Sequence, residues 1–474
     1  MPDPDVVVVG AGPAGISAAL ALAGAGVAVT LVDEQVAPGG QVYRAVDRVI
    51  RERPHTLDYY GADYARGREL TGRLPGSGIE LALSTSVWEL CREAGAVKIG
   101  LISDSRARVL SPRHVILAGG AMERPTPFPG WTLPGVMTVG AAQTLFKESA
   151  LVPEKPPVIC GRGPLVYLFT RQLLAAGLKS AVLLDCGSAG VPAGAWPALP
   201  GAIAADPGAF LKGLSWLRAI RRSQIDHQYG IGSLRAIGAD KLEAIEYTRQ
   251  GKTVELETGL LLVHDGVIPN CHLSMAAGCE HRWNEQQGCW QPLLDDNGRS
   301  SHDWLSICGD GATIGGAEAA ALGGRLVGSS VAHRLGAIDA DRFARETAQP
   351  RRMLARAGKL RRYLDMAYPP TGFLQGPFDD QTPICRCEGV VASEIRSAAA
   401  IGCMGPNQAK AFTRCGMGPC MGRQCGNAVS RILALFHRKS VAEMGYFNIR
   451  PPLKPVTVGE LARMEMPESA GTEP

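Results

Sequence analysis

Residues 5–41 read DVVVVGAGPAGISAALALAGAGVAVTLVDEQVAPGGQ and contain a complete nucleotide-binding pattern. The run Val6–Val9 is typical of a parallel strand that is buried on both faces. It leads into Gly10, Gly12 and Gly15, whose G-x-G-x-x-G spacing allows a tight turn, a close approach of backbone to a pyrophosphate, and close packing of helix on strand. The stretch therefore predicts the first strand and turn of a dinucleotide-binding fold.

The residues that follow complete this unit. A helix is expected from about Ala14 to Ala25, and its N-terminal N–H groups would face the phosphates. A second strand, Val27–Val32, then places Asp33 and Glu34 where a carboxylate can accept hydrogen bonds from ribose hydroxyls. The same carboxylate would repel a 2′-phosphate.

Composition limits the class of protein. A chain of 474 residues with 46% hydrophobic content should form two or three domains, and a net charge of +4 does not suggest a nucleic-acid or membrane partner. The uncharged stretch Val6–Val32 is interrupted by Gly-Pro, and Asp3 and Asp5 replace the basic flank of a signal peptide. The odd number of cysteines, 13, favours a reducing compartment, and we expect a cytoplasmic protein without a transmembrane segment.

Residues Val158–Asp185 repeat the opening pattern and predict a second Rossmann-like unit inserted in the first. Here Val166 replaces the third glycine and follows Pro164 and Leu165, which would crowd a pyrophosphate. Whether this unit binds a nucleotide or serves only as a docking scaffold stays open. No C-x-x-C motif lies in or near either unit, which speaks against a dithiol-disulfide reductase.

Four other segments belong to the same architecture. Leu81–Leu90 alternates apolar and polar residues and predicts a strand, His114–Gly120 predicts a buried strand running into paired glycines, and Leu260–Asn270 predicts the last strand of the inserted unit. Ser306–Gly324 predicts a strand, a Gly-Asp-Gly turn and an alanine-rich helix. Five histidines and cysteines within or after the third of these segments lack a regular ligand spacing, so we expect ordinary roles for them: His264, Cys271, His272, Cys279 and Cys289.

Together with Pro38-Gly39-Gly40-Gln41, these motifs resemble the FAD half of two-dinucleotide flavoproteins of the thioredoxin-reductase-like and amine-dehydrogenase-like group. The resemblance implies that the acid holds the adenosine ribose, that Gly39–Gln41 lies near the isoalloxazine, that Val87 offers backbone hydrogen bonds to the adenine, and that Asp310 binds the ribityl chain. It predicts these cofactor-binding residues: Gly10, Gly12, Pro13, Ala14, Gly15, Asp33, Glu34, Gln35, Gly39, Gly40, Gln41, Val87, Ala118, Gly119, Gly120, Gly309, Asp310, Gly316 and Ala317.

A cysteine-rich segment lies near the C-terminus, with the pairs Cys385-x-Cys387 and Cys420-x4-Cys425. Four thiolates can close a metal site, but a C-x-C pair is unusual for structural zinc and is better tolerated by an iron-sulfur cluster. The residues therefore favour a 2Fe-2S cluster over zinc. Ser393 could cap a short helix that ends at Gly402, and a second helix is expected from about Asn407 to Arg414.

The pattern C-x-C-E followed by K-x-x-T-R-x-G-M-G-x-C-x-G-R-x-C resembles the helical module related to bacterioferritin-associated ferredoxin. This module is fused to such a flavoprotein in the α subunits of opine oxidases, D-hydroxyproline and L-proline dehydrogenases, and hydrogen cyanide synthase. The resemblance implies cluster ligation by Cys385, Cys387, Cys420 and Cys425. Cys415 is an extra thiol that leaves the ligand assignment open.

We therefore predict an α/β fold with two Rossmann-like domains, the second inserted in the first, and a small C-terminal helical 2Fe-2S module. The expected divisions are the FAD domain at 1–148 and 273–345, the second Rossmann-like domain at 149–272, a basic helix and linker at 346–380, the 2Fe-2S module at 381–440, and a tail at 441–474. The basic helix is expected to be a solvated face or a surface that docks an acidic partner; its arginines are Arg351, Arg352, Arg356, Arg361 and Arg362.

The predicted function is that of an electron-transfer α subunit of an FAD-dependent amine or imino-acid dehydrogenase. Cofactor ligands can be placed, whereas no residue stands out as a catalytic base, nucleophile or substrate clamp. The resemblance implies that the partner is a glycine-oxidase-like flavoprotein β subunit, and it allows both a small γ subunit and an FMN at the interface. Two alternatives stay open: a self-contained NAD(P)H-dependent flavin reductase, and a non-catalytic nucleotide- and cluster-binding scaffold. Opines, hydroxyproline, proline, sarcosine and glycine are all candidate substrates.

Overall fold

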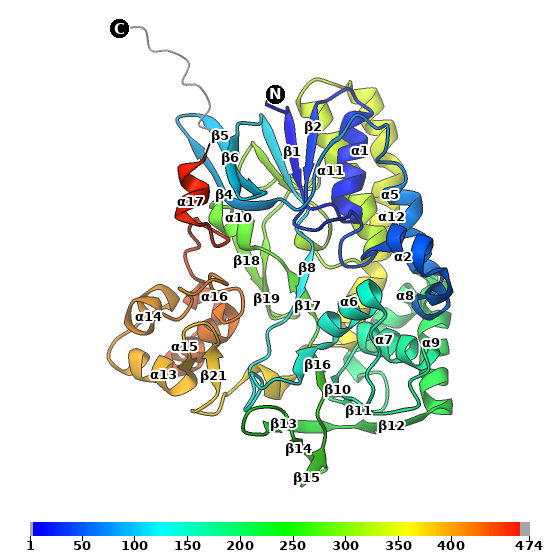
Figure 1. The fold of residues 1–474 in the computed structure, drawn as a ribbon, viewed down its shortest axis with the longest axis vertical. Coiled ribbons are helices and arrows are strands. Elements are labelled where there is room, and N and C mark those ends of the chain that lie inside the picture. The colour runs from blue at the N-terminus through cyan, green and yellow to red at the C-terminus, as the bar shows by residue number, and fades with distance from the viewer. Residues whose placement is uncertain (1–2, 465–474) are drawn as a thin grey trace.

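The computed structural model describes residues 3–464 and contains two Rossmann-like units and a helical C-terminal module (Figure 1). The first sheet has the strand order β20-β7-β1-β2-β3, and all of its strand pairs are parallel. Its strands are β1 (Val6–Val9), β2 (Val29–Val32), β3 (Glu80–Ala82), β7 (His114–Leu117) and β20 (Leu305–Ile307). Because β20 pairs with β7, the chain returns to the first unit after the insertion, as predicted.

The second sheet is also parallel, with the order β12-β11-β10-β16-β9. Its strands are β9 (Val136–Thr138), β10 (Val158–Gly161), β11 (Ser180–Asp185), β12 (Gln224–Tyr229) and β16 (Leu261–His264). Since β9 precedes the predicted division between residues 148 and 149, the sheet of the inserted unit starts before that division. The predicted fold class is confirmed.

Smaller sheets surround these two. The segment predicted as one strand over Leu81–Leu90 is divided between β3 and β4, because Ser84 takes a left-handed backbone conformation with φ +50°. An antiparallel pair, β8 with β17, joins the two units. The remaining strands are β4 (Ser86–Glu93), β5 (Ala96–Ser103), β6 (Arg106–Leu110), β8 (Ala121–Glu123), β13 (Ile231–Ile237), β14 (Ala244–Arg249), β15 (Lys252–Glu257), β17 (Val267–Pro269), β18 (His281–Asn284) and β19 (Cys289–Pro292).

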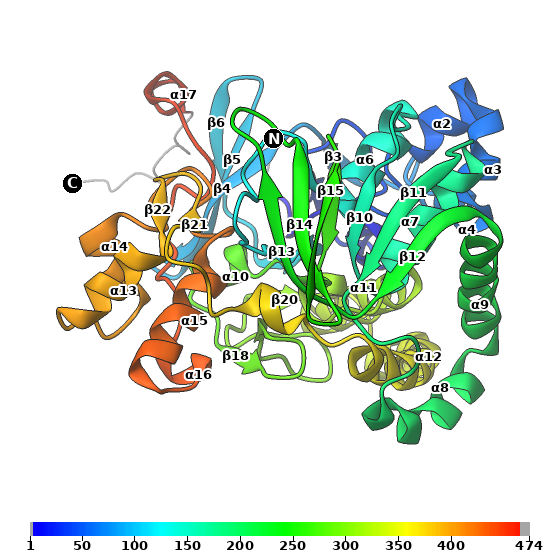
Figure 2. The same cartoon turned by 90° about the horizontal axis from the view of Figure 1, so that it is seen from below.

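Helices cover both sheets, and the basic helix α12 packs along α11 and α8 (Figure 2). The α-helices before the C-terminal module are α1 (Pro13–Ala23), α2 (Val46–Glu52), α3 (Leu57–Tyr60), α4 (Ala62–Ala65), α5 (Gly67–Thr71), α6 (Val139–Ser149), α7 (Pro164–Ala175), α8 (Leu199–Ala205), α9 (Pro207–Arg222), α10 (His272–Ala276), α11 (Ala317–Arg334) and α12 (Ala340–Ala367). Short 3-10 turns are η1 (Pro54–Thr56), η2 (Ala193–Ala198), η3 (Gly309–Gly311) and η4 (Gly372–Gln375). Among residues 3–464, none of the helices is both long and apolar enough to cross a membrane.

The C-terminal module lies beside the first unit and has its own core (Figure 2). Ile384, Ile395, Val429 and Leu433 are buried together in it. Ser393 does not cap a helix as predicted, because α13 begins one residue before it and Glu394 accepts a hydrogen bond from the N–H of Val391. The elements are β21 (Pro383–Cys385), β22 (Val390–Val391), α13 (Ala392–Ala400), α14 (Pro406–Thr413), α15 (Gly426–His437), α16 (Val441–Met444) and α17 (Val458–Ala462).

Three contacts fix this module to the Rossmann units. The ring Nε2–H of His272 donates to the carbonyl of Met421 at 2.8 Å, and Trp131 donates to the carbonyl of Pro383 at 2.7 Å. In the tail, the N–H of Leu453 donates to the carbonyl of Trp88 at 2.8 Å. The described part of the predicted tail is therefore packed against the first unit, whereas residues 465–474 lie outside the described residues.

Helices α1 and α11 pack closely against each other through glycines of α11. A Cβ on Gly324 would lie 2.0 Å from the carbonyl oxygen of Ala14, and one on Gly328 would lie 2.5 Å from that of Ala18. The two backbones can approach this closely only because α11 carries no side chain at these points. This contact holds the glycine turn after β1 against the helix that returns from the insertion.

Replacing Gly328 with alanine should lower the free energy of unfolding by about 1–3 kcal/mol, because the added methyl group would overpack a contact between backbones. Gly358→Ala is the matched control. Gly358 lies exposed in α12 with open space around it, so alanine should raise the free energy of unfolding by about 0.5–1 kcal/mol. Denaturant midpoints of both variants check this, and equal effects of the two substitutions would contradict it.

A second prediction concerns pH and the contact between His272 and Met421. Burial lowers the pKa of His272 to about 4 from its ordinary 6.5. As the pH falls from 6.5 toward 4, the unfolded chain binds a proton that the folded chain does not, so the free energy of unfolding falls. We expect a loss of roughly 2 kcal/mol between pH 7 and 5 from this group.

His272→Gln should reduce this pH dependence, because an amide can donate to Met421 without ionising. The exposed His55 supplies the control, and His55→Gln should leave the pH dependence unchanged. Thermal unfolding of both variants across this pH range tests the prediction. An unchanged pH response in His272→Gln would show that the protonation of His272 does not govern it.

Candidate functional site

A cleft of about 1260 Å³ lies at the carboxyl ends of the first sheet and extends toward the second unit and the module. Gly10 follows β1, Asp33 follows β2, Ala118 follows β7 and Asp310 follows β20 in its wall. This edge of a parallel sheet is where open α/β folds bind ligands. The cleft therefore coincides with the site predicted from the glycine pattern.

The glycines of the turn allow backbone to approach backbone and ligand. A Cβ on Gly15 would lie 1.7 Å from the carbonyl oxygen of Gly10, so α1 can pack on β1 only with glycine at this position. Gly40 has φ +61°, and a Cβ there would lie 2.9 Å from the Cα of Gly12. Between these segments the floor of the cleft is bare backbone at the N-terminus of α1, which suits a pyrophosphate.

The acids after β2 have different roles. Asp33 accepts hydrogen bonds from the N–H groups of Ala11 at 2.6 Å and Gln35 at 2.7 Å, and so ties the glycine turn to the second strand. Burial raises the pKa of Asp33, while these two hydrogen bonds oppose the rise. Glu34 lines the cleft and forms an ion pair with Lys454 at 2.8 Å. Both carboxylates lie at the ribose end of the predicted site.

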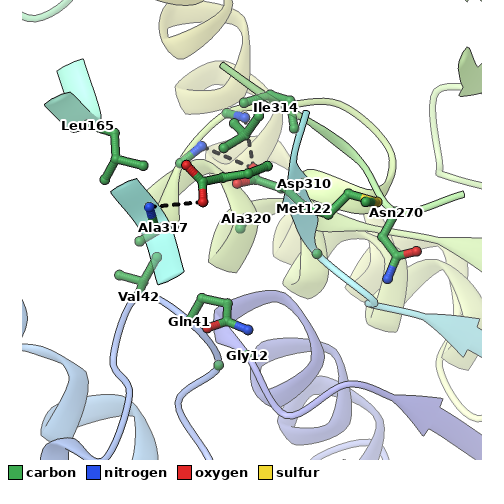
Figure 3. A pocket seen from close by; sticks show the side chains of 18 of the residues that line it. Gly12, Gln41, Val42, Met122, Leu165, Asn270, Asp310, Ile314, Ala317 and Ala320 are labelled. Atoms are coloured by element: carbon green, nitrogen blue, oxygen red, sulfur yellow. Dashed lines mark hydrogen bonds between the residues drawn. The ribbon is translucent and has the colours of Figure 1, made fainter. Parts of the chain in front are cut away.

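Asp310 is fixed on the opposite wall. Its Oδ1 accepts hydrogen bonds from the N–H groups of Gly315 at 2.8 Å and Gly316 at 3.1 Å. Its Oδ2 accepts no hydrogen bond from residues 3–464 and can accept one from a ligand hydroxyl. Helix α11 begins next to it at Ala317, so the positive end of that helix faces the cleft and favours negative charge on a ligand (Figure 3).

Most of the predicted cofactor-binding residues are brought together in the wall of this cleft. Three of them, Gly15, Gly39 and Gly309, do not line the cleft and instead shape its wall from behind. Gly39 has φ +123°, and a Cβ on Gly309 would lie 2.5 Å from the Cβ of Ala14. The predicted residues that line the cleft are Gly10, Gly12, Pro13, Ala14, Asp33, Glu34, Gln35, Gly40, Gln41, Val87, Ala118, Gly119, Gly120, Asp310, Gly316 and Ala317.

Two cations beside the Gly39–Gln41 segment were missed by the sequence analysis. The buried ammonium of Lys147 donates to the carbonyls of Gln41 and Val42 at 3.2 and 3.1 Å, and Arg44 donates to the side chain of Gln41 at 2.9 Å. Burial, and then the positive charge of Arg44, lower the pKa of Lys147 to about 7. Lys147 belongs to α6, more than a hundred residues from the segment that it holds, so no local pattern indicates it.

Strands β8 and β16 add a carboxylate and an imidazole to the cleft. Glu123 in β8 lies 2.7 Å from Nδ1 of His264 at the end of β16, and its second oxygen accepts from the N–H of Gly140 at 2.9 Å. Such a pair can hold a proton next to a ligand. His264 therefore has a place in the cleft that its irregular spacing did not predict. Leu165 of the second unit and Asn270 also line the cleft and lie on opposite sides of it in Figure 3.

In the second unit, the acid equivalent to Asp33 is Asp185, and its carboxylate is already bound by protein groups. Asp185 accepts hydrogen bonds from the hydroxyl of Tyr167 at 2.6 Å and the N–H of Gly187 at 2.8 Å. The guanidinium of Arg162 lies 3.5 Å from the same carboxylate. This guanidinium also packs on Gly187, where a Cβ would lie 2.1 Å from its Nη1. Tyr368 stacks on Arg162 at 5.3 Å from the far side. Protein side chains thus fill the position where this type of fold holds a ribose.

All five cysteines of the C-terminal motif converge in the module. The thiols of Cys385, Cys415 and Cys425 lie within 4.8 Å of one another. Burial raises the pKa of Cys387, and the thiol of Cys420 adds to the rise. Hydrogen bonds from Cys415 and then Cys425 lower the pKa of Cys385. The backbone N–H groups of Gly416 and Glu388 also contribute to the lowered pKa of Cys385, and such groups stabilise a thiolate ligand. The donor set suits thiophilic iron.

The module also contributes to the cleft itself. Arg423 and Gln424, between Cys420 and Cys425, line the cleft together with Leu453 and Lys454 of the tail. Arg423 donates to the carbonyl of Cys420 at 3.1 Å, so one loop connects the cysteine site to the nucleotide site.

Comparison with known proteins agrees with this architecture. Residues 4–188 match the family model described as pyridine nucleotide-disulphide oxidoreductase, whose fold implies FAD binding, and residues 381–464 match the sarcosine oxidase A3 domain. The crystal structure of L-proline dehydrogenase from P. horikoshii is similar in fold, with a TM-score of 0.70 and 22% identity over 97% of this chain and 79% of that chain.

Full-length sequence relatives are closer. The HcnB subunit of hydrogen cyanide synthase from Pseudomonas protegens is 32% identical over 95% of this chain and 96% of that protein. The A subunit of opine oxidase from Rhizobium meliloti strain 1021 is 40% identical over 98% of this chain and 99% of that protein. The protein is therefore an oxidoreductase, and it belongs to the family of the opine oxidase A subunits.

Proposed function

We propose that the protein is the electron-transfer α subunit of a heteromeric FAD-dependent dehydrogenase that oxidises an amine or imino acid of the opine, D-hydroxyproline, proline or glycine type. The observation that carries this proposal is the shared loop 420–425. Its ends are two of the proposed cluster ligands, and its middle residues, Arg423 and Gln424, line the nucleotide cleft. A flavin in the cleft and a cluster in the module would therefore be neighbours within one chain.

The residues of the cleft fit FAD in detail. The backbone of Gly10–Gly12 would hold the pyrophosphate, Asp33 or Glu34 the adenosine ribose, and Asp310 the ribityl hydroxyls. Arg44 and the N-terminus of α11, joined by Lys147 when it is protonated, place positive potential around the predicted isoalloxazine end, which favours the reduced, anionic form of a flavin. Bound there, FAD would take up electron pairs, and a 2Fe-2S cluster on the cysteines would carry single electrons onward.

The second unit supports an electron-transfer role over a self-contained NAD(P)H reductase. Asp185, which would receive the nicotinamide cofactor's ribose, is bound by Tyr167, Gly187 and Arg162. Opening this site would leave the buried carboxylate of Asp185 without its partners, which costs several kcal/mol. Electrons are therefore proposed to arrive from a partner subunit.

Both relatives are subunits of larger enzymes, which supports such a partner. We propose a glycine-oxidase-like flavoprotein β subunit, with an interface FMN and a small γ subunit, as the further components of the complex. One face of α12 offers a docking surface for an acidic partner, because its outward cations are exposed: Arg345, Arg352, Lys359 and Arg362. We also propose a cytoplasmic location, in keeping with 13 cysteines that are all free thiols.

The central test compares the chain alone with the chain co-expressed with the proteins encoded beside it. Alone, it should carry flavin, iron and acid-labile sulfide but should not oxidise opines, hydroxyproline, proline, sarcosine or glycine with a dye as acceptor. Co-expression should restore oxidation of one of these substrates. NADH should fail to reduce the flavin in stopped-flow experiments.

Three results would contradict the proposal. Full dehydrogenase activity of the lone chain would exclude the subunit role. Rapid reduction by NADH would favour the reductase, and a redox-inactive nucleotide in place of FAD would favour a scaffold.

Asp33→Asn should weaken flavin binding roughly tenfold or more, because a carboxylate that accepts from two backbone N–H groups contributes about 1.5–3 kcal/mol per hydrogen bond. Flavin absorbance per polypeptide after dialysis measures the loss. The control is Asp58→Asn on the exposed face of α3, which should bind flavin like the unmodified chain. Equal flavin retention in both variants would show that Asp33 does not organise the site.

A further inference from the structure

We propose that Cys415 is a reserve ligand for the cluster, able to replace Cys385 or Cys425 on the iron that these two would hold. The inference rests on the proposed 2Fe-2S cluster and assigns a role to the fifth cysteine of the motif. It concerns which thiols can reach each iron.

The five thiols form two groups of unequal size. Cys385, Cys415 and Cys425 are completely buried, and their sulfur atoms all lie within 4.8 Å of one another. Cys387 and Cys420 are the remaining two cysteines of the motif and do not belong to this converging group. A 2Fe-2S cluster takes four thiolates, two on each iron. One thiol of the larger group is therefore surplus.

The spacing of the larger group suits alternative ligation. Two thiolates on one tetrahedral metal ion, each bound at about 2.3 Å, lie roughly 4 Å apart. Sulfur atoms within 4.8 Å of one another can reach that separation by small side-chain rotations. Any two members of the group can thus bind the same iron, and the choice between them does not require the backbone to move.

The backbone holds Cys415 in this position. Helix α14 ends at Thr413, and Arg414 takes a left-handed conformation with φ +62° that turns the chain toward the other cysteines. The N–H of Cys415 donates to the hydroxyl of Thr413 at 3.2 Å. On its other side Gly416 packs so closely on Phe447 that a Cβ would lie 2.8 Å from the ring. Cys415 is therefore as firmly placed as the predicted ligands.

A cysteine elsewhere in the module provides the contrast. Cys403 is also buried, but its thiol donates to the carbonyl of Gly405 and it does not belong to the converging group. Replacing Cys403 changes the thiol content of the module without changing the ligand set.

The experiment measures iron and acid-labile sulfide per polypeptide, and the EPR spectrum of the reduced protein, after anaerobic purification. Cys415→Ala should load like the unmodified chain. Cys385→Ala and Cys425→Ala should each retain at least half of the cluster, with a shifted EPR spectrum, because Cys415 takes the empty position. The double variants C385A/C415A and C425A/C415A should retain less than a tenth.

The smaller group has no reserve, so Cys387→Ala and Cys420→Ala should each lose the cluster as completely as the double variants. Cys403→Ala should behave like the unmodified chain. Far-UV circular dichroism and flavin content, measured on every variant, separate cluster loss from failure to fold.

Two results would overturn the inference alone: loss of the cluster from Cys385→Ala and Cys425→Ala as complete as from Cys420→Ala, or loss from Cys415→Ala by itself. An unmodified chain that contains flavin but no iron or sulfide would instead overturn the proposed function, and this inference with it.

Discussion

The structure depends on contacts between bare backbones at the carboxyl edge of the first sheet. Gly10 follows β1 with φ +107°, and a Cβ there would lie 2.4 Å from the carbonyl oxygen of Ala118. Gly15 brings α1 onto the same turn, and Gly324 brings α11 onto α1. Three segments that are distant in the sequence thus meet where side chains have no room. This arrangement leaves N–H groups and helix N-termini, in place of side chains, to face the ligand.

Local patterns were sufficient to predict the parts of the structure that depend on local constraints. A glycine turn between a buried strand and a helix has few other uses, so the first unit, its echo at Val158–Asp185 and the returning strand β20 were all predicted from spacing. The cysteine motif likewise predicted a module with a separate core. Boundaries were less accurate, because β9 pairs with β16, a strand far along the chain, and nothing in its own sequence indicates that partner.

The side chains that complete the cleft could not be predicted for the same reason. Lys147 reaches Gln41 and Val42 across a long stretch of sequence. Glu123 meets His264 only because β8 pairs with β17, the strand that follows β16. Neither pair has a characteristic spacing. The sequence also could not predict that the carboxylate of Asp185 is bound by protein groups. It shows a correctly placed acid but does not show that Tyr167 and Arg162 contact it. Motifs identify positions, whereas the partners at those positions come from the tertiary fold.

The tail that follows the module has a thermodynamic consequence. Leu453 is bound to Trp88, and Lys454 pairs with Glu34, so a segment beyond the module forms one border of the nucleotide cleft. A ligand that contacts this border binds more tightly when the module is docked, and by reciprocity it strengthens docking by the same factor. Binding of a ligand at this border and docking of the module are therefore linked equilibria, and each one stabilises the other.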